Sequence, residues 1–191
     1  MPRQNNRFPA LRFSGRTVLM KIGILSDTHG NLQATATSAC LFAKAGVGAV
    51  FHCGDIGGYG VLEELAAVFL PLEVPVYAVL GNVDAYSNEW RFFPSNIGID
   101  LLGRFGEVVV GGTRIALLHS DDRARFRKCI AGGEYGLVPS GHSHEVHDHV
   151  VGGTRCINPG SAGRGDPGTC AVLDLASGQL AVLLTLAGEG C

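Results

Sequence analysis

The stretch GILSDTHGN, residues 23 to 31, joins the end of a buried strand to a group of polar side chains. Its apolar start predicts a short buried strand, and Gly30 with Asn31 opens a predicted helix. Asp27 and His29 fall between the two, just beyond the carboxyl end of the strand. Because open α/β sheets bind their ligands at that edge, the stretch indicates both a fold class and the place of a site.

The segment that follows alternates between helix and strand patterns. The predicted elements are a helix over 31–46 closed by Gly46, a strand over 47–55, a helix over 61–70 and a strand over 74–84. With the first strand over 20–26, this order is βαβαβ, which is typical of a parallel sheet with helices packed against it.

After about residue 97 the pattern changes to alternating strands separated by Gly-Gly turns, which predict hairpins. The predicted hairpins cover 99–120, 147–158 and 169–186, and a short helix lies at about 122–131. We therefore expect an α/β fold, a two-sheet sandwich in which a parallel first half packs face to face against a mostly antiparallel second half.

Composition favours a single compact domain. The chain has 191 residues, of which 46% are hydrophobic and 17% are charged, which is typical of a globular protein. Residues 1–19 show little periodicity, so they are interpreted as a disordered arm, or as a misassigned start if translation begins at Met20. The predicted domain covers 20–191.

Charge and cysteine content narrow the setting of the protein. The net charge is −2 and no dense basic stripe is present, so charge does not indicate a nucleic-acid partner, although nucleic acid stays open as a substrate. No segment resembles a membrane span or a secretory signal. The six cysteines lack CxxC spacing and several lie in apolar runs. They predict buried free thiols and a cytoplasmic protein.

Polar side chains follow five predicted strands, each at the point where the strand ends. These residues are Asp27, His29, Asp55, Asn82, Asp84, His119, His142 and His144. Residues two apart on an extended chain point to one side, so Asp27 with His29, and His142 with His144, are expected to aim at a common point. One such group alone is commonly a helix cap or a turn. Five groups at strand ends indicate a site.

The donor types in this set predict a metal centre. Carboxylates, imidazoles and an amide oxygen suit Mn²⁺, Fe²⁺, Zn²⁺ or Ni²⁺ rather than an ion that prefers thiolates. Seven such ligands exceed the needs of one tetrahedral ion, and they suit two ions that share a carboxylate.

The order of the motifs SDTHG, GD, GNVD, LLHSDD, GHSH and INPGS resembles the calcineurin-like metallophosphoesterases, especially their small single-domain bacterial and archaeal phosphodiesterases. The resemblance implies a two-sheet α/β sandwich and two divalent ions, most often Mn²⁺. It assigns the first ion to Asp27, His29, Asp55 and His144, and the second to Asp55, Asn82, His119 and His142. It implies hydrolysis of a small phosphodiester by a hydroxide shared between the ions, with Asp55 as the bridge.

Asn82 is expected to ligate through its amide oxygen and to donate from its NH₂ toward a phosphoryl oxygen. Many relatives carry a histidine after this asparagine, where it is thought to protonate the leaving group, but Val83 stands here. Asp84 either orients the neighbouring groups or replaces that acid through a water. Ser120 stands where relatives usually have glycine, and it is expected to leave His119 in place unless the backbone there needs a positive φ.

Other candidates are weaker. Arg164 is predicted to reach a substrate phosphate or to be a solvated loop residue, and Tyr59 to line the mouth of the site. Asn158 and Ser161 are predicted to hold the loop backbone. The histidines His52, His147 and His149 are interpreted as a core or supporting residue in the first case and as surface residues in the other two.

Two alternatives remain open at this stage. The retromer subunit that shares this fold has exchanged metal chemistry for partner binding, and a missing acid fits a metal-binding scaffold of that kind. A hydrolase of dinucleotides or cyclic nucleotides is the other alternative. A homo-oligomer is also open.

Overall fold

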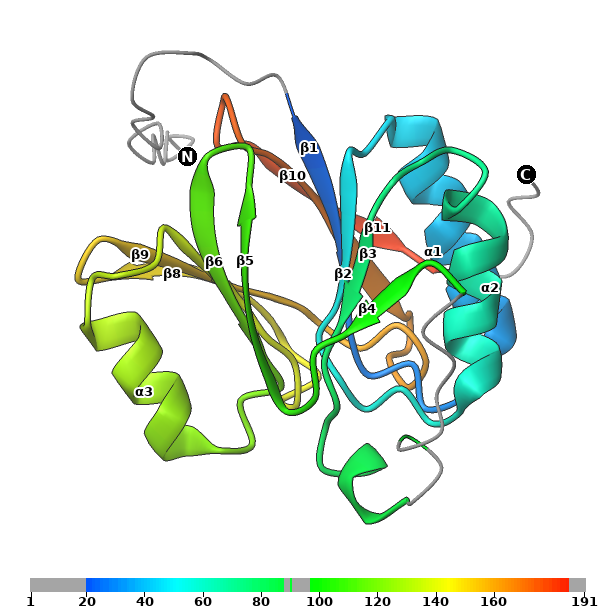
Figure 1. Cartoon of the computed structure of the whole chain (residues 1–191), viewed down its shortest axis with the longest axis horizontal. Coiled ribbons are helices and arrows are strands. Elements are labelled where there is room, and N and C mark those ends of the chain that lie inside the picture. Colours follow the sequence, from blue (N-terminus) through cyan, green and yellow to red (C-terminus); the bar gives the residue numbers. More distant parts are fainter. Residues whose placement is uncertain (1–19, 88–89, 91–96, 186–191) are drawn as a thin grey trace, which may run out of the picture.

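The computed structural model describes residues 20–87, 90 and 97–185. The N-terminal extension predicted over 1–19 lies outside the described residues. The described part forms four layers (Figure 1): two helices, a six-stranded sheet, a five-stranded sheet and a third helix. The predicted α/β two-sheet sandwich is confirmed.

The first sheet has the strand order β11-β10-β1-β2-β3-β4. Its strands are β1 (Lys21–Leu25), β2 (Ala49–His52), β3 (Val76–Ala78), β4 (Ile99–Leu101), β10 (Thr169–Asp174) and β11 (Leu180–Leu184). Strands β1 to β4 run parallel, and β10 pairs antiparallel with β1. Helices α1 (Leu32–Ala45) and α2 (Tyr59–Phe69) cover its outer face.

The second sheet has the order β5-β6-β7-β9-β8. Its strands are β5 (Phe105–Val110), β6 (Thr113–Leu118), β7 (Leu137–Pro139), β8 (Val146–Val151) and β9 (Thr154–Pro159), and helix α3 (Arg123–Ala131) lies on its outer face. A short 3₁₀ helix, η1 (Asp84–Tyr86), follows β3. Both outer pairs of strands are antiparallel hairpins, while β6, β7 and β9 run parallel.

Local sequence explains how the first unit begins. The side chain of Asn31 accepts a hydrogen bond from the Ala34 N–H at 3.0 Å and caps α1. Gly46 ends the helix in the left-handed conformation, as the sequence predicts. On β1, a Cβ atom at Gly23 would lie 2.6 Å from the ring of Phe42, so the glycine lets α1 approach the strand closely.

The core is divided among the three spaces between layers. Ile22, Ile24, Phe51 and Ile115 pack between the two sheets. Leu25 and Phe42 pack between the first sheet and its helices, whose buried partners include Leu62, Leu65 and Phe69. A smaller cluster under α3 contains Ala116, Leu118, Cys129, Tyr135 and Val138. Burial on both faces of β1 and β2 holds their carboxyl ends in place.

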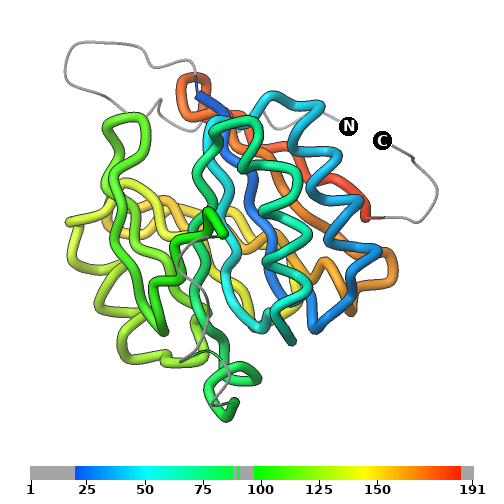
Figure 2. Tube along the Cα trace, turned by 45° about the vertical axis from the view of Figure 1, so that its right-hand side comes forward, coloured from blue at the N-terminus to red at the C-terminus, as the bar shows by residue number. Residues whose placement is uncertain are grey.

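The division of strands between the sheets differs from the prediction. The hairpin β10-β11 belongs to the first sheet rather than to the second half, and β4 pairs parallel with β3 (Figure 2). The physical reason is that β10 is buried on both faces, with Cys170 and Val172 toward the helices and Leu173 toward the second sheet. Such a strand needs an interior position between two layers.

Four of the six cysteines match the prediction. Cys53, Cys129, Cys156 and Cys170 are buried free thiols. Cys40 is disulfide-bonded, which the pattern of the sequence did not predict. Within the described ranges, no helix combines the length and the hydropathy that crossing a membrane requires.

Candidate metal centre

The predicted ligands come from loops at one edge of the two sheets. They follow β1, β2 and β3 in the first sheet and β6 and β7 in the second. Strands β1 to β3 are parallel to one another, and so are β6 and β7, so within each sheet these loops leave the same edge. Close contacts of His119 with Asp55 and of His144 with Asp27 join the two groups of loops.

The backbone of these loops is left-handed at most ligand positions. Among the described residues, seven other than glycine have a positive φ, and six of them lie in these loops: Asp27, His29, Asp55, Ser120, His142 and His144. The explanation from side-chain alternation on an extended chain is therefore wrong, although the side chains do converge. Non-glycine residues at positive φ are costly and are concentrated at functional sites.

Ser120 adopts φ 74°, the condition under which serine is less suitable than glycine. Its hydroxyl donates to the Gly141 carbonyl at 2.8 Å, a bond that glycine could not make. His119 keeps its place, because its Nδ1 lies 2.8 Å from the Cys53 carbonyl. The departure from the family pattern therefore ties the loop after β6 to the loop after β7.

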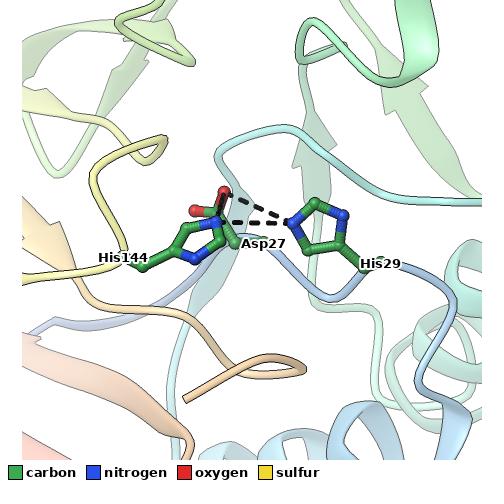
Figure 3. A group of neighbouring side chains, drawn as sticks. All are labelled: Asp27, His29 and His144. Carbon is green, nitrogen blue, oxygen red and sulfur yellow. Dashed lines mark hydrogen bonds and ion pairs between the residues drawn. The ribbon is translucent and has the colours of Figure 1, made fainter.

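Asp27, His29 and His144 form the first group of donors (Figure 3). Asp27 Oδ1 lies 3.1 Å from His144 Nε2 and 3.9 Å from His29 Nε2, and the two imidazole nitrogens are 3.4 Å apart. Asp27 is fully buried, and its Oδ2 accepts the His142 N–H at 3.1 Å. Its Oδ1 therefore points at the two imidazoles.

Asp27, Asp55 and His119 form the second group. His119 Nε2 lies 3.3 Å from Asp55 Oδ1 and 3.8 Å from Asp27 Oδ1. Asp55 also approaches the first group, because its Oδ2 lies 3.8 Å from His29 Nε2. Both carboxylates thus contact donors of both groups, and the bridging role of Asp55 stays a prediction.

Asn82 and His142 are placed beside the second group. The ring of His142 meets that of His119 edge-on, with centroids 5.2 Å apart. Val83, which follows Asn82, donates its N–H to Asp55 Oδ1 at 2.9 Å and so holds this loop against the carboxylate. All seven predicted ligands therefore lie in the loops that these contacts join.

His119 and Asp55 influence each other's protonation. Nδ1 of His119 must donate to the carbonyl of Cys53, since a carbonyl only accepts, and this leaves Nε2 facing two carboxylates. Burial would lower the pKa of His119, but the approach of the Asp55 carboxylate to its Nε2 and the nearby negative charge of Asp27 raise it. Burial opposes ionisation of Asp55, yet the nearby His119 imidazole and the hydrogen bond from the Val83 N–H lower its pKa.

Three buried atoms of the site bear on metal binding. Asp27 Oδ1, Asn82 Oδ1 and His119 Nε2 have no hydrogen-bond partner. Leaving such atoms buried and unbonded costs about 1–3 kcal/mol each, and more for a charged group. A metal ion is the partner that carboxylate, amide and imidazole acceptors have in common, so these residues fit the divalent ions that the family pattern implies.

Asp84 is turned away from solvent and is only 2% exposed. Its Oδ2 accepts the N–H groups of Gly81 at 2.8 Å and of Ile56 at 3.0 Å, and its Oδ1 accepts that of Gly57 at 3.0 Å. The carboxylate therefore connects the loop that carries Asn82 to the loop that carries Asp55.

Other buried polar side chains connect the loops of the site to one another. His52 Nδ1 accepts the Gly54 N–H, so its Nε2 donates to the Thr28 hydroxyl at 2.9 Å, which in turn donates to the Ile56 carbonyl. Burial lowers the pKa of His52 to about 3, which keeps the ring neutral. The sequence alone does not reveal this role of Thr28, because a threonine just before a helix is commonly a helix cap.

The family's NPGS segment has the supporting role predicted for it. Asn158 Nδ2 donates to the Gly141 carbonyl at 2.9 Å, and the hydroxyl of Ser161 donates to the Asp27 carbonyl at 2.9 Å. The backbone N–H of Arg164 donates to Ser161 Oγ at 3.0 Å. The loop thus holds Asp27 and the loop after β7 together.

The remaining candidates lie around the donors or apart from them. Arg164 is exposed, and its charge acts on His29: burial first, and then Arg164, lower the pKa of that imidazole. Val83 is 46% exposed. Tyr59 packs edge-on against Trp90, with centroids 5.2 Å apart, and its role at the mouth of the site stays a prediction. His147 and His149 are exposed on β8, as expected.

Comparison with known proteins identifies the family. A model of the calcineurin-like phosphoesterase superfamily domain matches residues 20–178. The chain is 30% identical over 142 residues to phosphodiesterase MJ0936 of Methanocaldococcus jannaschii, covering 74% of this chain and 83% of that protein.

Solved structures agree with this match. A structure described as that of a novel archaeal phosphodiesterase has a TM-score of 0.76 and 26% identity, covering 86% of this chain and 99% of its own. The E. coli phosphoesterase YfcE shares the fold, with a TM-score of 0.58 and 21% identity, covering 87% of this chain and 100% of its own. Together with the family match over residues 20–178, these findings show that the chain belongs to the calcineurin-like phosphoesterase superfamily.

Proposed function

We propose that this protein is a phosphodiesterase that depends on two divalent ions held by Asp27, His29, Asp55, Asn82, His119, His142 and His144. The similar M. jannaschii protein and the similar archaeal structure are both called phosphodiesterases. The observation that carries the proposal is the pair of donor groups that share Asp27, together with the atoms of Asp27, Asn82 and His119 that are buried without a hydrogen-bond partner. Two overlapping groups suit two neighbouring ions, and Mn²⁺ is the ion we expect.

Divalent ions held by these residues would lower the pKa of a bound water and neutralise charge on a phosphate under attack. The protein contributes orientation. Asn82 offers an NH₂ group that can donate to a phosphoryl oxygen while its oxygen binds metal. Arg164, exposed and near His29, is the side chain we assign to a substrate phosphate oxygen.

The leaving group receives no proton from the position after Asn82, because Val83 has no titratable group. General-acid assistance is typically worth about 10²–10⁴-fold, so good leaving groups should be favoured. We assign Asp84 a positioning role, because protonation would weaken the three N–H bonds that its carboxylate accepts. Activated aryl phosphodiesters are therefore the substrates that we expect to be cleaved fastest.

Metal content tests the proposal first. The purified chain, loaded with Mn²⁺ and dialysed, should hold about two ions by elemental analysis, the number expected of a two-metal site. His144→Ala should lose metal, because this imidazole lies in the first donor group. His147→Ala is the matched control, since that histidine is exposed on β8. No bound metal after loading would contradict the dinuclear site.

Substrate choice tests the second half of the proposal. An aryl phosphodiester, an aryl phosphomonoester, a dinucleotide and a cyclic nucleotide should be compared at saturating Mn²⁺. We expect the highest kcat/KM with the aryl diester. Faster cleavage of an unactivated monoester would show that another group supplies the proton, and a large preference for one nucleotide substrate would favour the nucleotide-processing alternative.

A further inference from the structure

A cavity of about 500 Å³ lies between α3 and β5. It is on the outer face of the second sheet, and the described residues that line it include none of the seven predicted metal ligands. Its volume lies within the roughly 300–1,000 Å³ typical of small-molecule sites. The cavity is therefore large enough for a ligand of its own.

The floor of the cavity is apolar and aromatic. Phe105, Cys129 and Tyr135 line it, and Tyr135 and Cys129 present only an edge to it, being 7% and 6% exposed. Burial raises the pKa of Cys129, so the neutral thiol behaves as an apolar group. Two aromatic rings in a floor favour a flat ring in the ligand, since aromatic groups gain from both area and ring geometry.

One wall carries carboxylates that already have partners. Glu107 accepts a hydrogen bond from the hydroxyl of Tyr135 and forms an ion pair with Arg114 at 3.2 Å. Glu134 lies 3.8 Å from the same guanidinium, which also stacks 5.0 Å from the centre of the Tyr135 ring. These bonds, first from Tyr135 and then from Arg114, lower the pKa of Glu107. Glu107 therefore stays ionised and can accept N–H or O–H groups of a ligand.

The opposite wall carries two cationic side chains that form fewer ion pairs. Arg125 lies above the Phe105 ring, 5.4 Å from its centre, and only 3.7 Å separates its Nε from Asp122. Lys128, almost one turn further along α3, forms no ion pair with any described residue. An anionic group of a ligand would therefore be drawn to Lys128 and Arg125.

We propose that this cavity binds a planar aromatic anion of the size of a nucleoside monophosphate. The ring lies on Phe105 and Tyr135, the anionic group meets Lys128 and Arg125, and a ring N–H donates to Glu107. The proposal is independent of metal chemistry, because every residue that it uses lies outside the metal centre.

Calorimetric titration of the whole chain tests the proposal. Adenosine monophosphate is the probe, and adenosine and inorganic phosphate report on the ring and on the anion separately. Each titration is repeated in the presence of a chelator, so that binding at the metal centre is recognised by its loss. We expect adenosine monophosphate to bind more tightly than either part, both with and without chelator.

Substitutions locate the binding. Lys128→Gln should weaken binding of adenosine monophosphate about five- to tenfold, the loss expected for one partly exposed charge-assisted hydrogen bond. Arg127→Gln is the matched control, an exposed neighbour on α3 that does not line the cavity. Phe105→Leu should weaken the nucleotide but not inorganic phosphate.

Three results would overturn the proposal. One is binding that does not saturate by about 10 mM, weaker than any affinity of use to a specific site. A second is equal affinity for inorganic phosphate and the nucleotide, because the aromatic floor would then be unused. The third is equal weakening by Lys128→Gln and Arg127→Gln, which would place the ligand elsewhere.

Discussion

Asp84→Asn removes one carboxylate oxygen from a buried group that joins two ligand loops. In the better amide orientation the oxygen keeps the N–H bonds from Gly81 and Ile56, and the NH₂ group faces the N–H of Gly57. One bond is lost, one buried donor is left unbonded and the other two bonds lose their charge. Because bonds to a charged group contribute roughly 1.5–3 kcal/mol, we expect a destabilisation of about 2–4 kcal/mol.

The assay combines stability with metal binding. Urea unfolding of the metal-free variant should show the lower free energy of unfolding. Affinity for Mn²⁺ should also fall, since the neutral amide holds the loop of Asn82 less firmly against the loop of Asp55. Asp174→Asn is the matched control: this carboxylate accepts N–H bonds from Ala176 and Ser177 in a turn between β10 and β11. It should leave metal binding unchanged.

If Asp84 only positions the two loops, its substitution should not change the preference for leaving groups. The dependence of rate on the leaving group should be the same in Asp84→Asn as in the wild type once both are saturated with metal. Unchanged stability and metal affinity, together with a selective loss on poor leaving groups, would refute the reasoning and identify Asp84 as the proton donor.

Three further predictions concern single residues. Val83→His should raise the rate on poor leaving groups while aryl diesters change little, measured as a plot of rate against leaving-group pKa; an unchanged slope would mean that this position does not govern protonation. Asp55→Ala should remove more Mn²⁺ in elemental analysis than His144→Ala, because a bridge serves both ions; equal losses would contradict the bridge. His52 has a pKa of about 3 in the folded protein against the ordinary value of 6.5 for an unfolded chain, so the folded state binds fewer protons below pH 6.5 and stability falls as the pH falls there. Replacement by Gln should remove up to about 1.4 kcal/mol per pH unit from that slope between pH 6 and 5, measured by urea unfolding, and parallel slopes would contradict it.

Much of the first half of the fold could be predicted from the sequence alone. The helix cap at Asn31 and the glycine at Gly46 mark α1, because their signals are local. The convergence of the polar side chains could also be predicted, since residues such as Asp27, Asp55 and Asn82 all follow strands whose carboxyl ends meet at one edge in a parallel sheet. Their role as metal ligands stays a prediction.

Tertiary structure decided what depends on partners far away in the chain. The place of β10 beside β1 follows from burial on both faces, which the local pattern of a hairpin does not reveal. The backbone at Ser120 is left-handed, and its hydroxyl finds a partner in Gly141, in a different loop. Asp84 connects the two loops because Ile56, 28 positions earlier, donates its N–H to the carboxylate. Periodicity in the sequence indicates which face of a helix or strand is buried. Hydrogen bonds between loops form only after folding has brought the two loops together, so no local pattern indicates them.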